Sequence, residues 1–356
     1  MRKLIIVQTA TPDYRKKFYV FIKQHLKDYF ELYSGDNYFE PTVESDKTID
    51  FNISIKNHFL FGNRLLFQTG IFWKQVIKEN VLVLEMNPRI LSNWIILLLR
   101  RAIGRETVLW GHAWPRSGLE SKSDKFRNFM RLLGNKIIVY TATQKIELEA
   151  KMPQKNIKSA PNAIYYKTEM VYNEREEEIT NIIYVGRLTK NKKPLFLVKA
   201  FSDIYKDLDK NTKLIIIGDG EEKKDVLDFV NNNKLQDRVL VLGHISDYDL
   251  LKEYYNTALL SVSPGYLGLS VTQSFGFGVP MLISKDEKHS PEVEAVRINH
   301  NAKYFKTDDL NALGNSIVEM FLNKKFWIQQ RRHINEACLT HYSIETMADP
   351  FIKLVE

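Results

Sequence analysis

The feature that most constrains the fold of this chain is an alternation of short apolar runs with amphipathic stretches. In the first half, Leu4–Thr9, Val81–Glu85 and Lys136–Tyr140 are short runs dominated by apolar residues. Between them, Arg15–Tyr29 and Ile90–Ile103 repeat apolar residues at helical spacing. Short apolar strands separated by helices are typical of a parallel sheet that is covered by helices on both faces.

The same alternation restarts after the charged run 173–178, beginning with a strand over Asn181–Val185. A length of 356 residues also exceeds what one core usually takes. We therefore expect an α/β fold of two doubly wound, Rossmann-like domains that face a central cleft, with ligands at the carboxyl ends of the strands. The expected domains are residues 1–165 and 166–340, followed by a helix in 341–356 whose return to the first domain is left open.

Three glycine-containing turns follow strands in the second half. Turn 186–193 holds four cations within seven residues, turn 218–220 reads Gly-Asp-Gly, and turn 265–270 precedes a helix. Cations and backbone N–H groups beside a helix N-terminus form a site for a diphosphate. Each turn alone is weak support, since a solvated basic turn or tight glycine packing explains it equally well.

At this spacing the three turns together resemble the carboxyl-terminal domain of glycosyltransferase family 4, a group of retaining enzymes with the GT-B fold. The resemblance covers residues 181–322. The first half is similar in its landmarks only, namely Tyr14-Arg15, Trp110-Gly111-His112 and Pro161-Asn162-Ala163. The resemblance implies a retaining glycosyltransferase that moves a sugar from a nucleotide diphosphate sugar to a glycan or lipid-linked acceptor in cell-surface polysaccharide biosynthesis.

The resemblance also implies roles for individual residues. Arg187 and Lys192 would hold the donor diphosphate and stabilise the departing nucleotide, and His112 would contact the donor sugar near the reacting carbon. Tyr14 and Arg15 would lie on the acceptor side. The further donor-binding residues that it implies are Gly186, Gly218, Gly220, His244, Gly265, Gly268, Leu269, Ser270 and Gln273.

Three positions depart from the family pattern. Gly265 and Gln273 stand where the family has two glutamates, and Lys193 stands where it has a glycine. Gln273 can still donate to and accept from a ribose, so nucleotide binding can survive the change. Gly265 removes a sugar contact, which leaves three readings: a different donor sugar, a contact supplied by another group, or lost activity.

Two alternatives to a transferase remain open at this point. A nucleotide-sugar 2-epimerase has the same fold but needs several acid/base groups, for which His112, Glu85 and Glu106 are the candidates. A non-catalytic polyanion-binding protein could be built on the basic half. Aromatic residues are not interleaved with the basic ones, so we expect no nucleic-acid partner.

The sequence has no group of residues with metal-ligand spacing, and family resemblance implies transfer without a metal. We therefore expect no metal site and no cofactor, with the nucleotide sugar as co-substrate.

The charge of the chain is unevenly distributed. Residues 1–165 carry 26 Lys and Arg against 15 Asp and Glu, a formal charge of +11, and residues 166–356 carry 25 against 28, or −3. A basic half suits an anionic partner or is simply solvated. The helix Ile90–Ile103 is apolar and is closed by Arg100, Arg101 and Arg105, so it is a candidate for docking on an anionic membrane, with a core-packed helix as the equal alternative.

A single cysteine, Cys338, cannot form an internal disulfide and indicates a reducing compartment. We expect a cytoplasmic protein, and leave open a peripheral attachment at the inner face of the cell membrane.

Overall fold

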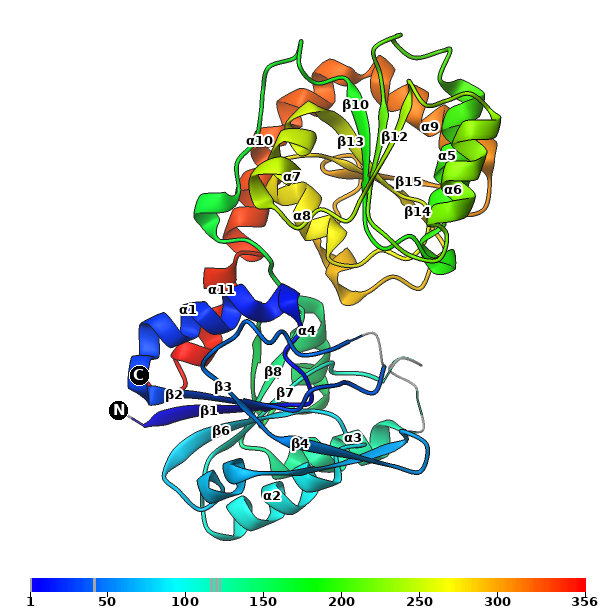
Figure 1. The fold of residues 1–356 in the computed structure, drawn as a ribbon. Helices are drawn as coiled ribbons and strands as arrows, with labels where there is room; N and C mark the ends of the chain where they lie inside the picture. Colours follow the sequence, from blue (N-terminus) through cyan, green and yellow to red (C-terminus); the bar gives the residue numbers. More distant parts are fainter. Residues whose placement is uncertain (1, 41–42, 116–117, 119–120, 122) are drawn as a thin grey trace. The chain divides into compact units, whose positions relative to one another are not determined.

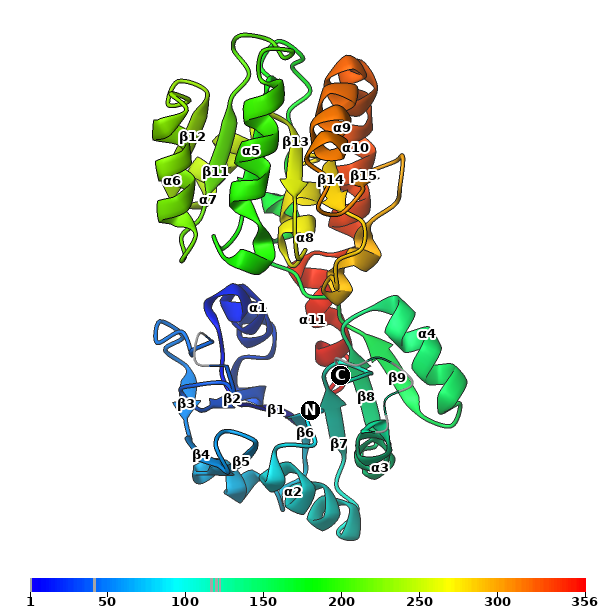
Figure 2. The ribbon, with the colours of Figure 1, turned by 90° about the vertical axis from the view of Figure 1, so that its right-hand side faces the viewer.

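The computed structural model describes residues 2–40, 43–115, 118, 121 and 123–356. The chain divides into two compact units: residues up to Tyr166 together with Tyr342–Glu356, and the continuous segment Lys167–His341. Each unit contains an open parallel sheet with helices on both faces (Figures 1 and 2). The predicted α/β class with two Rossmann-like domains is therefore confirmed.

The first unit is built on a seven-stranded sheet in the order β3-β2-β1-β6-β7-β8-β9. Its central strands are buried on both sides, which explains why their sequences are continuous apolar runs. A separate antiparallel hairpin pairs β4 with β5. The strands are β1 (Lys3–Gln8), β2 (Phe30–Ser34), β3 (Asn52–Ser54), β4 (Lys56–Leu60), β5 (Leu65–Thr69), β6 (Asn80–Glu85), β7 (Thr107–Trp110), β8 (Lys136–Val139) and β9 (Asn156–Ser159).

Helices cover both faces of this sheet (Figure 1). On one face lie α1 (Lys16–Leu26) and α11 (Ile344–Ile352), and on the other lie α2 (Leu91–Ala102), α3 (Asp124–Leu133) and α4 (Ala142–Lys151). The tail of the chain completes the first of these layers, because the ring of Phe351 lies 5.1 Å from that of Phe18 and 4.8 Å from that of Trp110.

The second unit has a six-stranded parallel sheet in the order β12-β11-β10-β13-β14-β15. The strands are β10 (Asn181–Val185), β11 (Leu214–Ile217), β12 (Val239–Gly243), β13 (Ala258–Ser263), β14 (Met281–Ser284) and β15 (Ala302–Phe305). The helices are α5 (Pro194–Ile204), α6 (Lys223–Asn232), α7 (Tyr248–Thr257), α8 (Ser270–Gly276), α9 (Leu310–Leu322) and α10 (Lys324–His341). Short 3₁₀ helices complete the chain: η1 (Asp13–Arg15), η2 (Lys27–Tyr29), η3 (Ile71–Gln75), η4 (Lys167–Glu169), η5 (Lys190–Lys192) and η6 (Pro291–Ala295).

The end of α2 corrects one expectation from the sequence. Arg100, which the sequence left as a candidate either for lipid contact with Arg101 and Arg105 or for a core-packed helix, is fully buried. Its guanidinium donates to the carbonyl oxygens of Val76, Asn80 and Glu106 at 2.7–2.8 Å. Burial lowers the pKa of Arg100 to about 10, so the side chain stays charged at neutral pH. Arg100 thus ties α2 to the amino ends of the neighbouring strands and is not available to a membrane.

The contribution of the tail to the first unit can be measured. Phe351→Ala removes a fully buried ring between Phe18 and Trp110. It should lower the free energy of unfolding of this unit by about 3 to 5 kcal/mol. Four of the five tryptophans lie in the first unit, so denaturation followed by tryptophan fluorescence reports on it. The control Phe326→Ala, at a ring that is 42% exposed on α10, should leave that transition in place. Equal effects of the two substitutions would contradict a structural role of the tail.

Candidate active site

The second sheet brings the three glycine-containing turns together, because β11, β10 and β13 are neighbours and run parallel. The first two turns are packed backbone against backbone. Leu188 N–H donates to the carbonyl oxygen of Asp219 at 2.8 Å. Gly218 has a φ of +152°, and a Cβ there would lie 1.9 Å from the carbonyl oxygen of Gly186. Only glycine fits at this contact, and Gly220 is held in the same way against Leu188.

The first and third turns are locked by an equally close contact. Tyr266 N–H donates to the carbonyl oxygen of Asn191 in η5 at 2.8 Å. A Cβ on Gly265 would lie 2.3 Å from that same oxygen, which is closer than real Cβ atoms come. Position 265 is therefore restricted to glycine by the approach of the backbone of η5.

Lys192 is the cation that this arrangement places against the third turn. The Nζ of Lys192 lies 4.8 Å from the ring centroid of Tyr266. A Cβ on Gly268 would lie 3.6 Å from the same Nζ. The pKa of Lys192 is lowered to about 8, mainly by burial and in addition by the nearby Arg187 cation, while Glu292 opposes the shift. Lys192 is half-buried and Arg187 is exposed, so two neighbouring cations mark this edge of the sheet.

Motif spacing indicated no role for Glu292. It lies in η6 and is only 8% exposed. Its carboxylate is close enough to Lys192 to stabilise the charged ammonium. No spacing rule could have indicated this partner, because it lies a hundred residues further along the chain.

Lys193 points to different partners from Lys192. Its Nζ forms ion pairs with Glu287 at 2.5 Å and with Asp308 at 2.6 Å. Its backbone is left-handed, with φ of 54°, which is the conformation that glycine adopts most easily. A glycine would adopt this backbone conformation without strain. The two ion pairs separate Lys193 from the cations of the candidate site.

His289 holds the third turn through hydrogen bonds at both ring nitrogens. The sequence motifs did not indicate this role. Leu267 N–H donates to Nδ1 of His289 at 3.1 Å, and Nε2 lies 2.8 Å from the carbonyl oxygen of Ser284. Because Nδ1 accepts, Nε2 carries the proton and the ring is neutral. Burial lowers the pKa of His289, which favours this neutral form.

The remaining expected donor-site residues lie at the same edge of the sheet. Leu269 precedes α8, Ser270 begins it, and Gln273 lies one turn further along. His244 is exposed just beyond the end of β12, near Asp219.

The expected residues of the first unit gather at the carboxyl ends of its central strands. The Arg15 guanidinium donates to the Tyr140 hydroxyl at 2.9 Å and lies 4.7 Å from the ring centroid of Trp110. Arg15 is therefore anchored in an aromatic setting, whereas Tyr14 beside it is 39% exposed. His112 follows β7, is exposed, and lies edge-on to Tyr140 with ring centroids 4.6 Å apart.

Glu85 joins this group at the end of β6, opposite Trp110 in the register of β6 and β7. Its carboxylate accepts from the backbone N–H of Thr9, and burial raises its pKa. A carboxyl group that shares an edge with His112 and Tyr140 can hold an acceptor hydroxyl.

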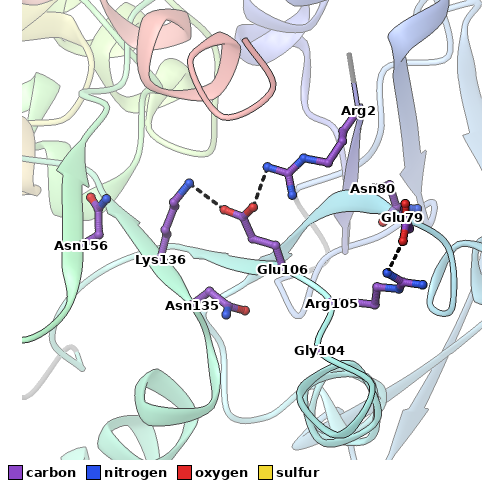
Figure 3. Close-up of a pocket in the computed structure, with 9 residues that line it drawn as sticks. All are labelled: Arg2, Glu79, Asn80, Gly104, Arg105, Glu106, Asn135, Lys136 and Asn156. Atoms are coloured by element: carbon purple, nitrogen blue, oxygen red, sulfur yellow. Dashed lines mark hydrogen bonds and ion pairs between the residues drawn. The ribbon is translucent and has the colours of Figure 1, made fainter.

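Glu106 does not join them. It lies at the amino end of β7, where it pairs with Arg2 at 2.8 Å and with Lys136 at 2.7 Å. These side chains line a polar hollow of about 600 Å³ at the amino edge of the sheet (Figure 3). Glu106 is thereby removed from the acid/base set that a 2-epimerase was expected to use.

No three His, Cys, Asp or Glu side chains within the described ranges are grouped so that they could hold a metal ion.

Comparisons with known proteins agree with this layout. Residues 167–337 match the family model described as glycosyl transferases group 1. An uncharacterized glycosyltransferase of Methanocaldococcus jannaschii is 26% identical over 313 residues, which cover 82% of this chain and 76% of that protein. The GalNAc-alpha-(1->4)-GalNAc-alpha-(1->3)-diNAcBac-PP-undecaprenol alpha-1,4-N-acetyl-D-galactosaminyltransferase of Campylobacter jejuni is 22% identical over 201 residues, 56% of this chain and 55% of that one.

The crystal structure of Anabaena HepE in complex with UDP superposes with a TM-score of 0.71 at 13% identity, covering 100% of this chain and 99% of HepE. HepE has also been solved in complex with UDP-glucose. The likeness along both units confirms the GT-B fold. Together with the family match and the named relatives, it identifies this chain as a glycosyltransferase.

Proposed function

We propose that the enzyme is a retaining transferase of family 4 that moves a sugar from a nucleotide diphosphate sugar to a glycan or lipid-linked acceptor in cell-surface polysaccharide biosynthesis. One observation carries this proposal. Lys192 is held half-buried beside Arg187, on a turn whose backbone is bonded to the turn that precedes α8. Two neighbouring cations beside a turn that leads into a helix are what a leaving diphosphate requires.

In this proposal the chain's own cations perform the main catalytic work. As the bond between sugar and diphosphate breaks, negative charge grows on the leaving oxygen. Arg187 and Lys192 stabilise that charge from a turn whose backbone is already held in place by hydrogen bonds. Gln273 would bind the ribose, and His112 would contact the transferred sugar.

The acceptor is proposed from two lines of support. The Campylobacter jejuni relative is named for an undecaprenol-linked acceptor. Residues 1–165 of this chain carry the formal charge of +11, which favours anionic surfaces. We therefore infer a lipid-linked acceptor and action at the inner face of the cell membrane.

A panel of nucleotide sugars, each offered to the purified full chain together with undecaprenol-linked glycan acceptors, tests the proposal. Release of the nucleotide, with transfer of the sugar at retained anomeric configuration, is the expected result. Conversion of the nucleotide sugar into its 2-epimer would instead show the alternative enzyme of the same fold. An absence of both reactions with every donor would contradict the proposal.

Removing either cation should reduce turnover without unfolding the chain. We expect Arg187→Ala and Lys192→Ala each to lower kcat by about 100-fold or more, which corresponds to about 3 kcal/mol of lost charge stabilisation. The matched control is Lys190→Ala, which removes an exposed cation from the same turn and should leave kcat nearly unchanged. Wild-type turnover in either of the first two variants would overturn their assignment.

The lowered pKa of Lys192 predicts how nucleotide affinity depends on pH. The ammonium is mostly charged at pH 7 and mostly neutral at pH 9, because its pKa is about 8. If only the charged form holds the diphosphate, the Kd of UDP should rise about tenfold between pH 7 and pH 9, as measured by calorimetry. Lys192→Arg, which stays charged, should flatten this dependence. An equal pH dependence in both proteins would place the titrating group elsewhere.

Gly265 should not accept the glutamate that the family has there. Because a Cβ at this position meets the Asn191 carbonyl oxygen at 2.3 Å, Gly265→Ala and Gly265→Glu should both lower kcat/KM for the donor by about tenfold or more. Lys190→Ala, at an exposed side chain of the neighbouring turn, is the control and should leave kcat/KM nearly unchanged. Higher donor turnover in Gly265→Glu would show that the position can still perform the family role.

A further inference from the structure

The outer surface of α2 and α3 carries a cluster of large apolar side chains that the core does not use. These helices lie side by side on the face of the first sheet opposite α1 and α11 (Figure 1). Their inner residues, such as Ile96 and Met130, are buried against the sheet. The outer side chains, called here the α2–α3 face, are Ile95, Leu98, Leu99, Phe126, Phe129 and Leu132.

The exposure of this face is high for apolar groups. Phe126 is 69% exposed, Phe129 54% and Leu98 52%. Single exposed apolar residues need no explanation, but a contiguous group of this size marks an interaction surface.

Direct contacts make the face continuous across the two helices. The ring of Trp94 on α2 stacks on that of Phe129 on α3, with centroids 5.8 Å apart and an interplanar angle of 22°. At the other end, Arg101 Nη1 and Lys155 Nζ each donate to the carbonyl oxygen of Leu132 at 3.0 Å. The two helices therefore present one surface, with cations at the carboxyl end of α3.

The exposed charges on the two helices themselves have one sign. Residues 90–105 contain no Asp or Glu, and the one acid of α3, Asp124, is 4% exposed and paired with Arg131 and Lys151. Arg101 and Lys125 are exposed on the same helices. A partner that buries apolar side chains and accepts cations at their edge is an anionic lipid surface.

We infer that the α2–α3 face inserts into the headgroup region of an anionic bilayer and holds the first unit there. Among the described residues no helix is long and apolar enough to cross a bilayer. A shallow, reversible attachment is the mode that two short amphipathic helices provide. Of the three cations that the sequence suggested, Arg100 is buried and Arg105 pairs with Glu79, whereas Arg101 is exposed together with Lys125 of α3.

The position of α3 connects this attachment to the proposed acceptor side. Arg127 Nη1 on α3 donates to the carbonyl oxygens of Met86 at 2.6 Å and His112 at 3.1 Å. A bilayer that holds α3 therefore holds the segment that carries His112. This consequence rests on the lipid-linked acceptor proposed above, whereas attachment itself does not.

Co-sedimentation of the full chain with vesicles tests the inference. We expect binding to vesicles of phosphatidylcholine with about one third phosphatidylglycerol at 50 mM salt, and loss of most binding at 500 mM salt. Leu98→Gln/Phe126→Gln should weaken the partition coefficient by about tenfold or more, and Arg101→Gln/Lys125→Gln should weaken the salt dependence.

The matched control is Ile146→Gln/Leu322→Gln, which changes two apolar side chains that are 65% and 82% exposed on α4 and α9. This variant should bind like the wild type, and all variants should turn over a soluble donor at the wild-type rate. A chain that stays in solution at low salt, or equal losses in the control, would overturn the inference. The inference would also be overturned if sedimentation velocity showed a wild-type dimer that Leu98→Gln/Phe126→Gln dissociates, because the α2–α3 face would then bind a second copy of the chain. Vesicle binding without any donor turnover would contradict the proposed transferase activity but would still support membrane binding by the α2–α3 face.

Discussion

The close approach of three backbone turns at one edge of the second sheet is the constraint on which the candidate site depends. Gly218 touches Gly186, and the Tyr266 N–H bonds the Asn191 carbonyl oxygen. These contacts leave no room for side chains where the turns touch, so only glycine fits there. The packed backbone of the three turns carries the other side chains of the site. Lys192 keeps its position because the turn that carries it cannot shift without separating from its neighbours.

The sequence identified the elements whose burial is continuous. β6, β10 and β11 have apolar residues on both faces, and their runs are recognisable without context. Two edge strands gave no such signal: β9 buries only Ile157, and β15 mixes Lys303 and Tyr304 with its two buried residues. The helix α4 was also missed, since Leu148 is its one buried residue.

The site was predictable where it is local in sequence and not where it is formed by distant residues. Motif spacing indicated Arg187 and Lys192 because both follow one strand. Glu292 and His289 follow β14 and lie far from these turns in the sequence. Only the folded structure shows that they lie close to the turns. The burial of Arg100 was not predictable for a related reason. The sequence pattern of a cation at the end of an apolar helix suggests an exposed side chain, but backbone carbonyl groups from two other segments enclose this one.

The return of the tail to the first unit has a consequence for biosynthesis. The second unit is one continuous segment, whereas the core of the first unit lacks a component until Phe351 has left the ribosome. The unit that begins the chain is thus the one that finishes last. During translation its half-open core, with Phe18 and Trp110 exposed, must be protected from aggregation while the later segment already folds.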